Sequence, residues 1–187
     1  MRIYAIFAND NITGTSYKAY QHAIKTLKEQ SHTIDELLLY DKINDIPFFK
    51  HDRSYMESHS FYLENKNHFM QADMLLIVFP LFWYSVPGIL KTWIDMINNW
   101  AYHYESGSQA TPLHHIKKAI IIYTSMQSHH SEEKISQPVE MQFLETFKFI
   151  GIFDVLFYNI DNVSTINQEK LKHHLEQIEK LCQSCKS

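Results

Sequence analysis

Five apolar runs divide this chain, and a pattern typical of a helix follows each of them. The runs lie at residues 3–8, 33–39, 73–80, 119–124 and 152–160. Runs that are apolar throughout, rather than at every second position, are typical of strands buried on both faces. Helices between successive strands act as crossover connections, so the strands should lie parallel in an α/β sheet that helices cover on both faces.

The helical patterns differ in strength. The strongest lies at residues 86–100, where apolar side chains recur at intervals of three or four and predict a one-faced helix. Pro87 falls in the first turn of that helix, where a missing N–H group costs nothing. Four weaker patterns predict further helices, at residues 17–27, 58–72, 139–150 and 171–185. Gly151 stands where a glycine commonly ends a helix, and residues 41–56 are expected to form a surface loop.

Composition supports a single domain over residues 1–187. The 187 residues are 45% apolar and 20% charged, and no linker-like segment or repeat divides them. The net charge is −4 and no block of basic residues occurs, which disfavours binding of nucleic acid or of an anionic membrane. No apolar run reaches the roughly 18 residues of a spanning helix, so no membrane insertion is expected.

The cysteines and the first residues indicate a reducing compartment. Two cysteines do not make a disulfide framework, and the first residues lack the layout of a signal peptide, so we expect a cytoplasmic protein. Cys182 and Cys185 form a C-x-x-C pair that continues the apolar stripe of a predicted helix, which favours core or surface thiols over a redox or metal site. Adjacent histidines point in different directions, and no metal site is expected.

The loop after the first strand could hold a phosphate. For five strands the flavodoxin-like order is the natural candidate, and ligands then bind beyond the carboxyl ends of the strands. Hydroxyl groups and Gly14 precede a helix here, and a helix start offers free N–H groups. The hydroxyls belong to Thr13, Thr15 and Ser16. Such residues could instead cap the helix without a ligand, and Asp10 would oppose an anion unless it points away.

Three consecutive aromatic residues, Phe82, Trp83 and Tyr84, follow the third strand. Side chains of this size are costly to leave in water, so they should meet a core, a partner or a flat ligand. A planar heterocycle could lie on Phe82 or Trp83 while backbone N–H groups meet its polar edge.

The segment from Pro80 to Asp95 carries the most specific motif. It reads P-L-F-W-Y-S-V-P-G-I-L-K-T-W-I-D and closely resembles the pattern P-x-x-W-x-x-x-P-A-x-L-K-G-W-x-D of the flavodoxin-like NAD(P)H:quinone oxidoreductases. That family includes the modulator-of-drug-activity proteins and the ancillary oxidoreductases of potassium-efflux channels. The matching residues are Pro80, Trp83, Pro87, Leu90, Lys91, Trp93 and Asp95. The strand and helix pattern of the whole chain is compatible with the five-stranded parallel sheet of this family.

The resemblance implies a flavin, either FMN or FAD with FMN favoured, at three strand ends. The flavin phosphate would be held by Thr15, Ser16 and Tyr17. The ring would be lined by Pro80, Leu81, Phe82, Trp83 and Tyr84. Its other edge would lie along Thr124, Ser125, Met126 and Gln127.

The resemblance also implies an activity and an assembly. Proteins of this family take a hydride from NAD(P)H and pass it to a quinone or a similar small acceptor in ping-pong order, with the cofactor carrying the chemistry. His129 is a candidate for handling a proton. Family members are usually homodimers with the pocket at the interface.

Two other functions stay open on the sequence alone. A regulatory protein of the same fold, with or without a flavin, could sense redox state or bind a partner such as a transporter through the aromatic loop. An electron carrier would favour a more acidic surface than a net charge of −4 provides. Two loops depart from the family pattern, since Asn9-Asp10 stands for the usual His-Pro and the segment from Thr124 to Gln127 lacks glycine.

Overall fold

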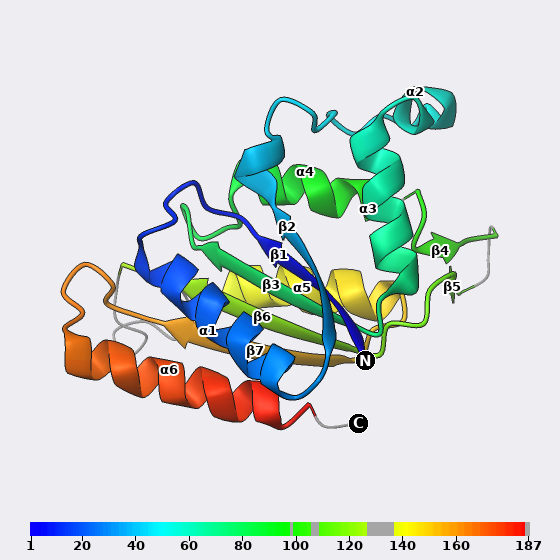
Figure 1. Ribbon diagram of the computed structural model, residues 1–187. Coiled ribbons are helices and arrows are strands. Elements are labelled where there is room, and N and C mark those ends of the chain that lie inside the picture. The colour runs from blue at the N-terminus through cyan, green and yellow to red at the C-terminus, as the bar shows by residue number, and fades with distance from the viewer. Residues whose placement is uncertain (98, 106–108, 127–136, 186–187) are drawn as a thin grey trace.

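A five-stranded parallel sheet forms the centre of the molecule. The computed structural model describes residues 1–97, 99–105, 109–126 and 137–185. The strands follow the order β2-β1-β3-β6-β7, and every neighbouring pair is parallel (Figure 1). Their bounds are β1 Arg2–Phe7, β2 Thr33–Leu38, β3 Met74–Pro80, β6 Lys118–Thr124 and β7 Asp154–Ile160. The predicted flavodoxin-like fold is therefore confirmed, and all five strands come from the five apolar runs.

The sheet is buried on both faces because successive side chains of a strand point in opposite directions. In β1, Ile3, Ala5 and Phe7 pack on the face covered by α1 (Thr15–Glu29) and α6 (Gln168–Gln183). The residues between them, Tyr4 and Ile6, pack on the opposite face. A continuous apolar run thus supplies two separate cores.

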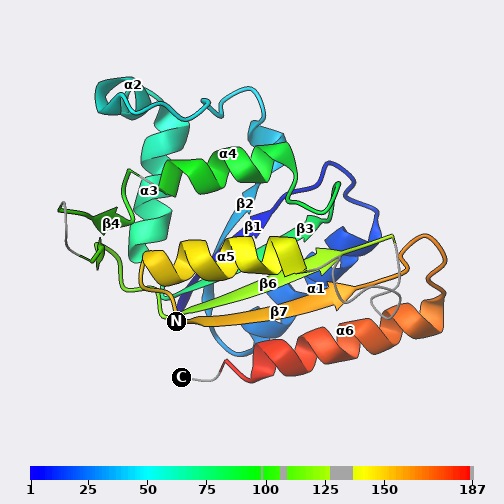
Figure 2. The same cartoon turned by 180° about the vertical axis from the view of Figure 1, so that it is seen from behind.

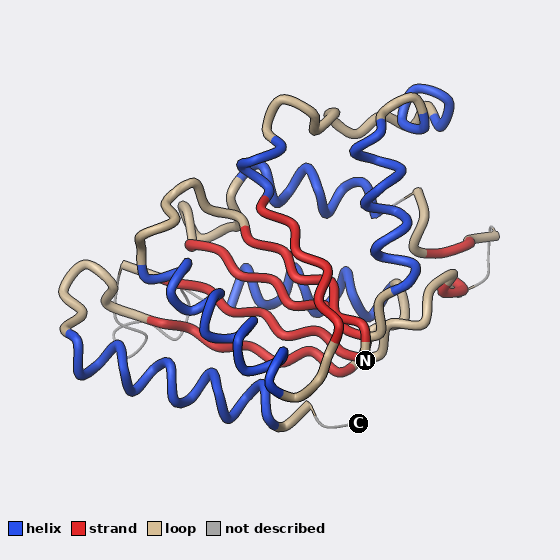
Figure 3. The backbone as a smooth tube through the Cα atoms, in the orientation of Figure 1, coloured by secondary structure: helices blue, strands red, loops and turns tan. Residues whose placement is uncertain are grey.

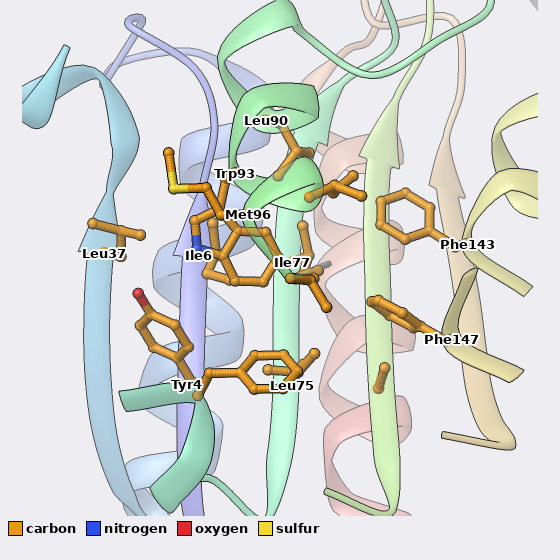
Figure 4. Packing of buried hydrophobic residues seen from close by; sticks show 14 of the residues in the cluster. Tyr4, Ile6, Leu37, Leu75, Ile77, Leu90, Trp93, Met96, Phe143 and Phe147 are labelled. Atoms are coloured by element: carbon orange, nitrogen blue, oxygen red, sulfur yellow. The ribbon is translucent and has the colours of Figure 1, made fainter. Parts of the chain in front are cut away.

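Three longer helices cover the second face, as Figure 2 shows from behind. They are α3 (Ser60–Gln71), α4 (Gly88–Ile97) and α5 (Gln137–Phe149). Trp93 of α4 and Phe143 and Phe147 of α5 point toward the sheet and meet Ile77 and its neighbours (Figure 4). The regular spacing predicted for residues 86–100 therefore reflects one buried stripe of α4.

A buried asparagine ties three elements of this second core together. Asn65 of α3 is only 3% exposed, and its Oδ1 accepts hydrogen bonds from the hydroxyl of Tyr4 and, at 3.0 Å, from Nε1 of Trp93. Its Nδ2 donates to the carbonyl of Phe61 at 2.7 Å. Both polar atoms of the buried amide are thus satisfied, and both aromatic donors gain a partner.

Two local predictions are wrong in detail. Residues 41–56 are not a continuous loop, because the short helix η1 (Leu39–Lys42) extends into them and α2 (Arg53–Glu57) forms where Asp52 accepts a bond from the N–H of Tyr55 at 3.0 Å. Pro87 precedes α4 instead of lying in its first turn. Its carbonyl accepts the first helical bonds, at 2.9 and 3.0 Å.

A small antiparallel hairpin was not predicted. Strands β4 (Tyr102–His103) and β5 (Thr111–Pro112) pair beside the main sheet and stand away from it (Figure 1). Gly151 ends α5 as predicted, with a φ of +90°. A Cβ atom at Gly151 would also lie 2.3 Å from Cγ of Pro112, so glycine is needed both for the backbone and for the contact with β5.

Candidate functional site

The strands β1, β3 and β6 end side by side at the carboxyl end of the sheet, opposite the end at which the N-terminus lies (Figure 3). Pro80 pairs with Thr124, and the N–H of Leu81 donates to the carbonyl of Thr124 at 2.8 Å. The N–H of Ala8 donates to the carbonyl of Val78 at 2.9 Å. These bonds bring the three predicted site loops to one end of the sheet, near the switch point between β1 and β3.

The first loop is shaped by asparagine side chains. Nδ2 of Asn9 donates to Oγ of Ser16 at 2.9 Å, and Oδ1 of Asn9 accepts from the N–H of Asn11 at 3.3 Å. Oδ1 of Asn11 in turn accepts from the N–H and the hydroxyl of Thr13, at 3.0 and 2.9 Å. Asparagine commonly bonds backbone groups two residues ahead in this way, so the shape of the loop is fixed by its own side chains.

Helix α1 begins at this loop without a side-chain cap. Gly14, which has no side chain, occupies the N-cap position, and among the described residues no side chain is found to bond the first amides. By contrast, Asp52 caps α2 and Asn167 caps α6. The alternative in which a hydroxyl of the first loop caps α1 is therefore wrong, and the N–H groups of Thr15 and its neighbours are left for another acceptor.

A Cβ atom at residue 14 would meet Nδ2 of Asn11 at 3.0 Å, so glycine leaves room at the start of α1. Of the residues predicted to hold a phosphate, Ser16 is buried at 3% exposure, while Thr15 and Tyr17 are half-buried. Asp10 is exposed to solvent, and its charge adds to burial in raising the pKa of Tyr40 in η1. The carboxylate of Asp10 therefore lies close enough to act on that phenol.

The second loop makes a tight turn with an unusual backbone. Phe82 and Ser85 exchange two backbone hydrogen bonds of 3.0 Å, and the residues between them, Trp83 and Tyr84, have φ values of 50° and 62°. Two consecutive left-handed residues are typical of a type I′ turn, which favours asparagine and glycine and is strained for large side chains.

This turn presents its aromatic side chains to solvent. Trp83 is 95% exposed, and Phe82 and Tyr84 are about half exposed. An interpretation of the aromatic loop as part of the core is therefore wrong. A flat ligand or a partner remains as the reason for three exposed aromatic groups on strained backbone.

The third loop is tied to β7. Thr124 and Ser125 are buried, and Oγ of Ser125 donates to Oδ1 of Asn159 at 3.2 Å. The N–H of Ser125 donates to the carbonyl of Ile160 at 2.9 Å. Met126 is 65% exposed and stands next in the chain, so it can pack against a ligand or be left in water. Gln127 and His129 lie outside the described residues.

Sequence reasoning did not find the polar residues that support this site. Asn9 and Asn11 organise the first loop, and Asn159 holds Ser125 from the neighbouring strand. The two loop asparagines directly after a buried strand were a usable signal, because such residues favour local turns. Asn159 carried no such signal, because its role depends on the pairing of β6 with β7.

A hollow in the described part of the chain is lined by none of the predicted site residues that the structure describes. A concavity of about 1260 Å³ opens between α4, α5 and the β4–β5 hairpin. One wall of it is aromatic, at Tyr102, Tyr104, Phe149 and Phe153, and the rings of Tyr102 and Phe149 meet edge to face at 4.9 Å.

Cys182 and Cys185 lie elsewhere, buried against the first face, and burial raises the pKa of both thiols, that of Cys182 to about 12. They are core thiols, as predicted.

Comparison with known proteins decides the family. A family described as having a flavodoxin-like fold matches residues 1–182. The chain belongs to this flavodoxin-like family. None of the helices in the described part of the chain has the length and apolarity needed to cross a membrane.

Individual relatives are more distant. A ribosyldihydronicotinamide dehydrogenase-like protein from Penicillium crustosum is 26% identical over 176 residues, which cover 75% of this chain and 64% of that protein. The chain thus spans about 64% of the length of this curated relative.

Two solved structures show the same fold over nearly the whole chain. An NAD(P)H:quinone oxidoreductase from Methanothermobacter marburgensis matches with a TM-score of 0.83 and 18% identity, covering 100% of this chain and 96% of the other. An FMN-dependent NADH-azoreductase from Bacillus anthracis, solved in complex with FMN, matches with a TM-score of 0.81 and 19% identity, covering 98% and 99%.

Proposed function

We propose that this protein is a flavin-dependent NAD(P)H oxidoreductase that reduces quinones or similar small acceptors, with FMN as the favoured flavin. The observation that carries the proposal is the strained turn of Trp83 and Tyr84, which exposes an aromatic surface beside the uncapped start of α1. A flavin needs both features, since it joins a flat apolar ring to an anionic tail. The named activities of the similar proteins support the same class of reaction.

The residues at the start of α1 fit the phosphate of a flavin. The uncapped N–H groups of Thr15, Ser16 and Tyr17 and the positive end of the helix dipole attract an anion. Gly14 leaves the approach open, and the buried hydroxyl of Ser16 supplies a further polar group. No acidic residue lies in the first turn of α1 to oppose the negative charge.

The second and third loops fit the ring. Phe82, Trp83 and Tyr84 offer aromatic surface for stacking. Leu81 follows directly after β3, the strand that lies between β1 and β6. Pro80 ends β3 without an N–H group of its own, and Thr124, Ser125 and Met126 lie across from it at the end of β6. When bound, a flavin supplies hydride transfer between NAD(P)H and the acceptor. The second and third loops would position the ring, and the backbone N–H groups there would donate hydrogen bonds to its polar edge. Gln127 at the ring edge and His129 in proton handling stay predictions.

The assembly and the location are finer parts of the proposal. The concavity beside the β4–β5 hairpin, with its exposed aromatic wall at Phe149 and Phe153, is a surface that a second copy of the chain could cover in a homodimer. Light scattering of the purified protein tests this, because a monomer at working concentration would contradict it. The buried free thiols Cys182 and Cys185 support a cytoplasmic location.

The alternative is a binding protein that uses the aromatic turn against a protein partner such as a transporter. One observation favours it, namely the 95% exposure of Trp83, because a large exposed aromatic group is typical of the centre of a protein interface. The same exposure suits a ligand ring, so the two functions differ in whether the purified protein binds a flavin.

The absorbance spectrum of the purified protein, before and after addition of FMN or FAD, tests the function. We expect flavin bands that bleach with NADPH or NADH under anaerobic conditions and return when menadione is added. Reciprocal initial rates plotted against reciprocal NAD(P)H concentration, at several fixed acceptor concentrations, should give parallel lines. Parallel lines are the signature of ping-pong order. A protein that binds neither flavin would contradict the enzyme and favour the binding protein.

A further inference from the structure

We propose that Asn9 is a positioning residue for the flavin phosphate, because it forces the hydroxyl group of Ser16 to act as a donor. The inference rests on the proposed flavin function and concerns one of the two positions at which this chain departs from the family's His-Pro start. Asn9 itself lies on the loop before α1, and its effect on the phosphate passes through Ser16.

The orientation of the Asn9 amide follows from its partners. A backbone N–H group can only donate, so the atom of Asn9 that lies 3.3 Å from the N–H of Asn11 must be the oxygen Oδ1. The amide nitrogen Nδ2 therefore faces Ser16, at 2.9 Å from its Oγ. The hydrogen-bond partners therefore fix which atom of the Asn9 amide is oxygen and which is nitrogen.

This bond decides what the Ser16 hydroxyl can do. An amide NH₂ group only donates, so Oγ of Ser16 is the acceptor, and its single proton must point away from Asn9. A serine inside a helix often donates to the carbonyl four residues earlier, but for Ser16 that residue is Ile12, which precedes α1. In the part of the chain that the structure describes, no acceptor for this proton is found, although Ser16 is only 3% exposed.

A buried hydroxyl donor beside uncapped helix amides selects for an acceptor. A fully ionised phosphate offers only acceptor oxygens, and its charge also matches the positive end of the α1 dipole. A ligand group that brings its own donor, such as the terminal hydroxyl of riboflavin, gains much less. Asn9 therefore raises the affinity for the phosphorylated flavin and leaves binding of the ring unchanged.

The variant Asn9→Asp tests this, because it has nearly the same shape and keeps Oδ1 for the N–H of Asn11. Its second carboxylate oxygen accepts instead of donating, so the hydroxyl of Ser16 turns toward residue 9 and its proton is consumed there. We expect the dissociation constant for FMN, measured by quenching of flavin fluorescence, to rise at least about tenfold. The constant for riboflavin should change less than about twofold, and equal losses for both flavins would overturn the inference.

The added negative charge requires a matched control. The double variant Asn9→Asp/Asp10→Asn exchanges the two side chains and keeps the summed charge of the loop. We expect FMN binding to stay weak in this variant, because the Ser16 proton is still consumed. Recovery of FMN binding to the level of the unmodified protein would assign the loss to charge and overturn the inference.

A Ser16→Ala background tests whether Asn9 acts through Ser16. In that background Asn9→Ala, which removes the donor without adding charge, should weaken FMN binding by less than about twofold, although it weakens binding clearly when Ser16 is present. The same loss in both backgrounds would overturn the inference. If the unmodified protein binds neither flavin, the proposed function fails as well. If it binds FMN and Asn9→Asp binds FMN as tightly, only the role of Asn9 fails.

Discussion

The two ends of the sheet are built differently. At the amino end, where the strands begin, charged groups are paired, with Nε of Arg2 at 2.5 Å from Asp35 and Nζ of Lys118 at 3.0 Å from Asp154. The N–H of Arg2 also donates to Asp73 at 2.6 Å. At the carboxyl end, α1 starts without a cap, and the second loop holds two aromatic residues in the left-handed region.

This contrast separates stability from binding. Charged side chains are paired at the amino end, whereas the uncapped start of α1 and the two left-handed aromatic residues lie at the carboxyl end. Strain of this kind persists only where the surrounding structure holds it, and it commonly marks a functional site. Changes at or toward the amino end should therefore lower stability and leave flavin binding unchanged. Changes at the carboxyl end should weaken flavin binding without lowering stability.

The largest effect is expected from Asn65→Leu, in the core toward the amino end. The hydroxyl of Tyr4 and Nε1 of Trp93 would both lose their acceptor inside the core, and the carbonyl of Phe61 would lose the side-chain donor that supplements its helical bond. We expect a loss of about 3 kcal/mol or more in the free energy of unfolding, measured in urea. The control Asn67→Leu on the same helix, where the side chain is exposed, should cost less than about 0.5 kcal/mol. Similar losses at both positions would mean that the buried network contributes little.

The next effect is expected from Trp83→Gly in the second loop. Glycine accepts the φ of 50° without strain, so the free energy of unfolding should rise by up to about 1 kcal/mol. The ring surface is lost at the same time, and FMN affinity should fall at least about tenfold. Phe48→Ala, at a side chain 80% exposed outside the three site loops, should leave FMN affinity unchanged. If the Trp83→Gly variant were less stable than the unmodified protein and bound FMN as tightly, the second loop would serve stability and not binding.

The strands and the main helices could be predicted because their signals are local and repeated. The run at β3 is apolar over seven buried residues, and α4 shows one regular stripe. The β4–β5 hairpin could not be predicted, because strands of two residues carry no periodic pattern. Its place depends on contacts far along the chain, such as Pro112 against Gly151.

The candidate site was predictable by position but not by geometry. Topology places the loops after β1, β3 and β6 together, and the motif at Pro80 marks the second loop. The left-handed backbone of Trp83 and Tyr84 was hidden, because a type I′ turn is normally inferred from asparagine and glycine. The bond from Asn9 to Ser16 was hidden as well, because it depends on where α1 begins relative to the end of β1.

A smaller effect is expected from Asp35→Asn at the amino end. The hydrogen bond from Arg2 holds the pKa of Asp35 below its usual range. A lowered pKa in the folded state means that the stabilisation is present above the unfolded pKa of about 4 and disappears as the pH falls through the folded value. The variant should therefore be less stable at pH 7, and its difference from the unmodified protein should shrink in urea titrations below about pH 4. A difference that is constant with pH would show that the carboxylate charge is not the cause.

The smallest change is expected for the thiols of Cys182, near the end of α6, and of Cys185, just after it. Cys185 lies near Lys118 and Asp154 at the amino end, and burial is the main cause of the raised pKa of Cys182 and Cys185. A neutral buried thiol is a poor nucleophile, so both should react with an aromatic disulfide reagent only as fast as the protein opens. Urea should accelerate the reaction in step with unfolding, whereas saturating FMN should slow it only to the extent that it stabilises the fold. Rapid reaction of either thiol in the native protein would show that the amino end opens locally, and the division between a closed end and a binding end would then fail.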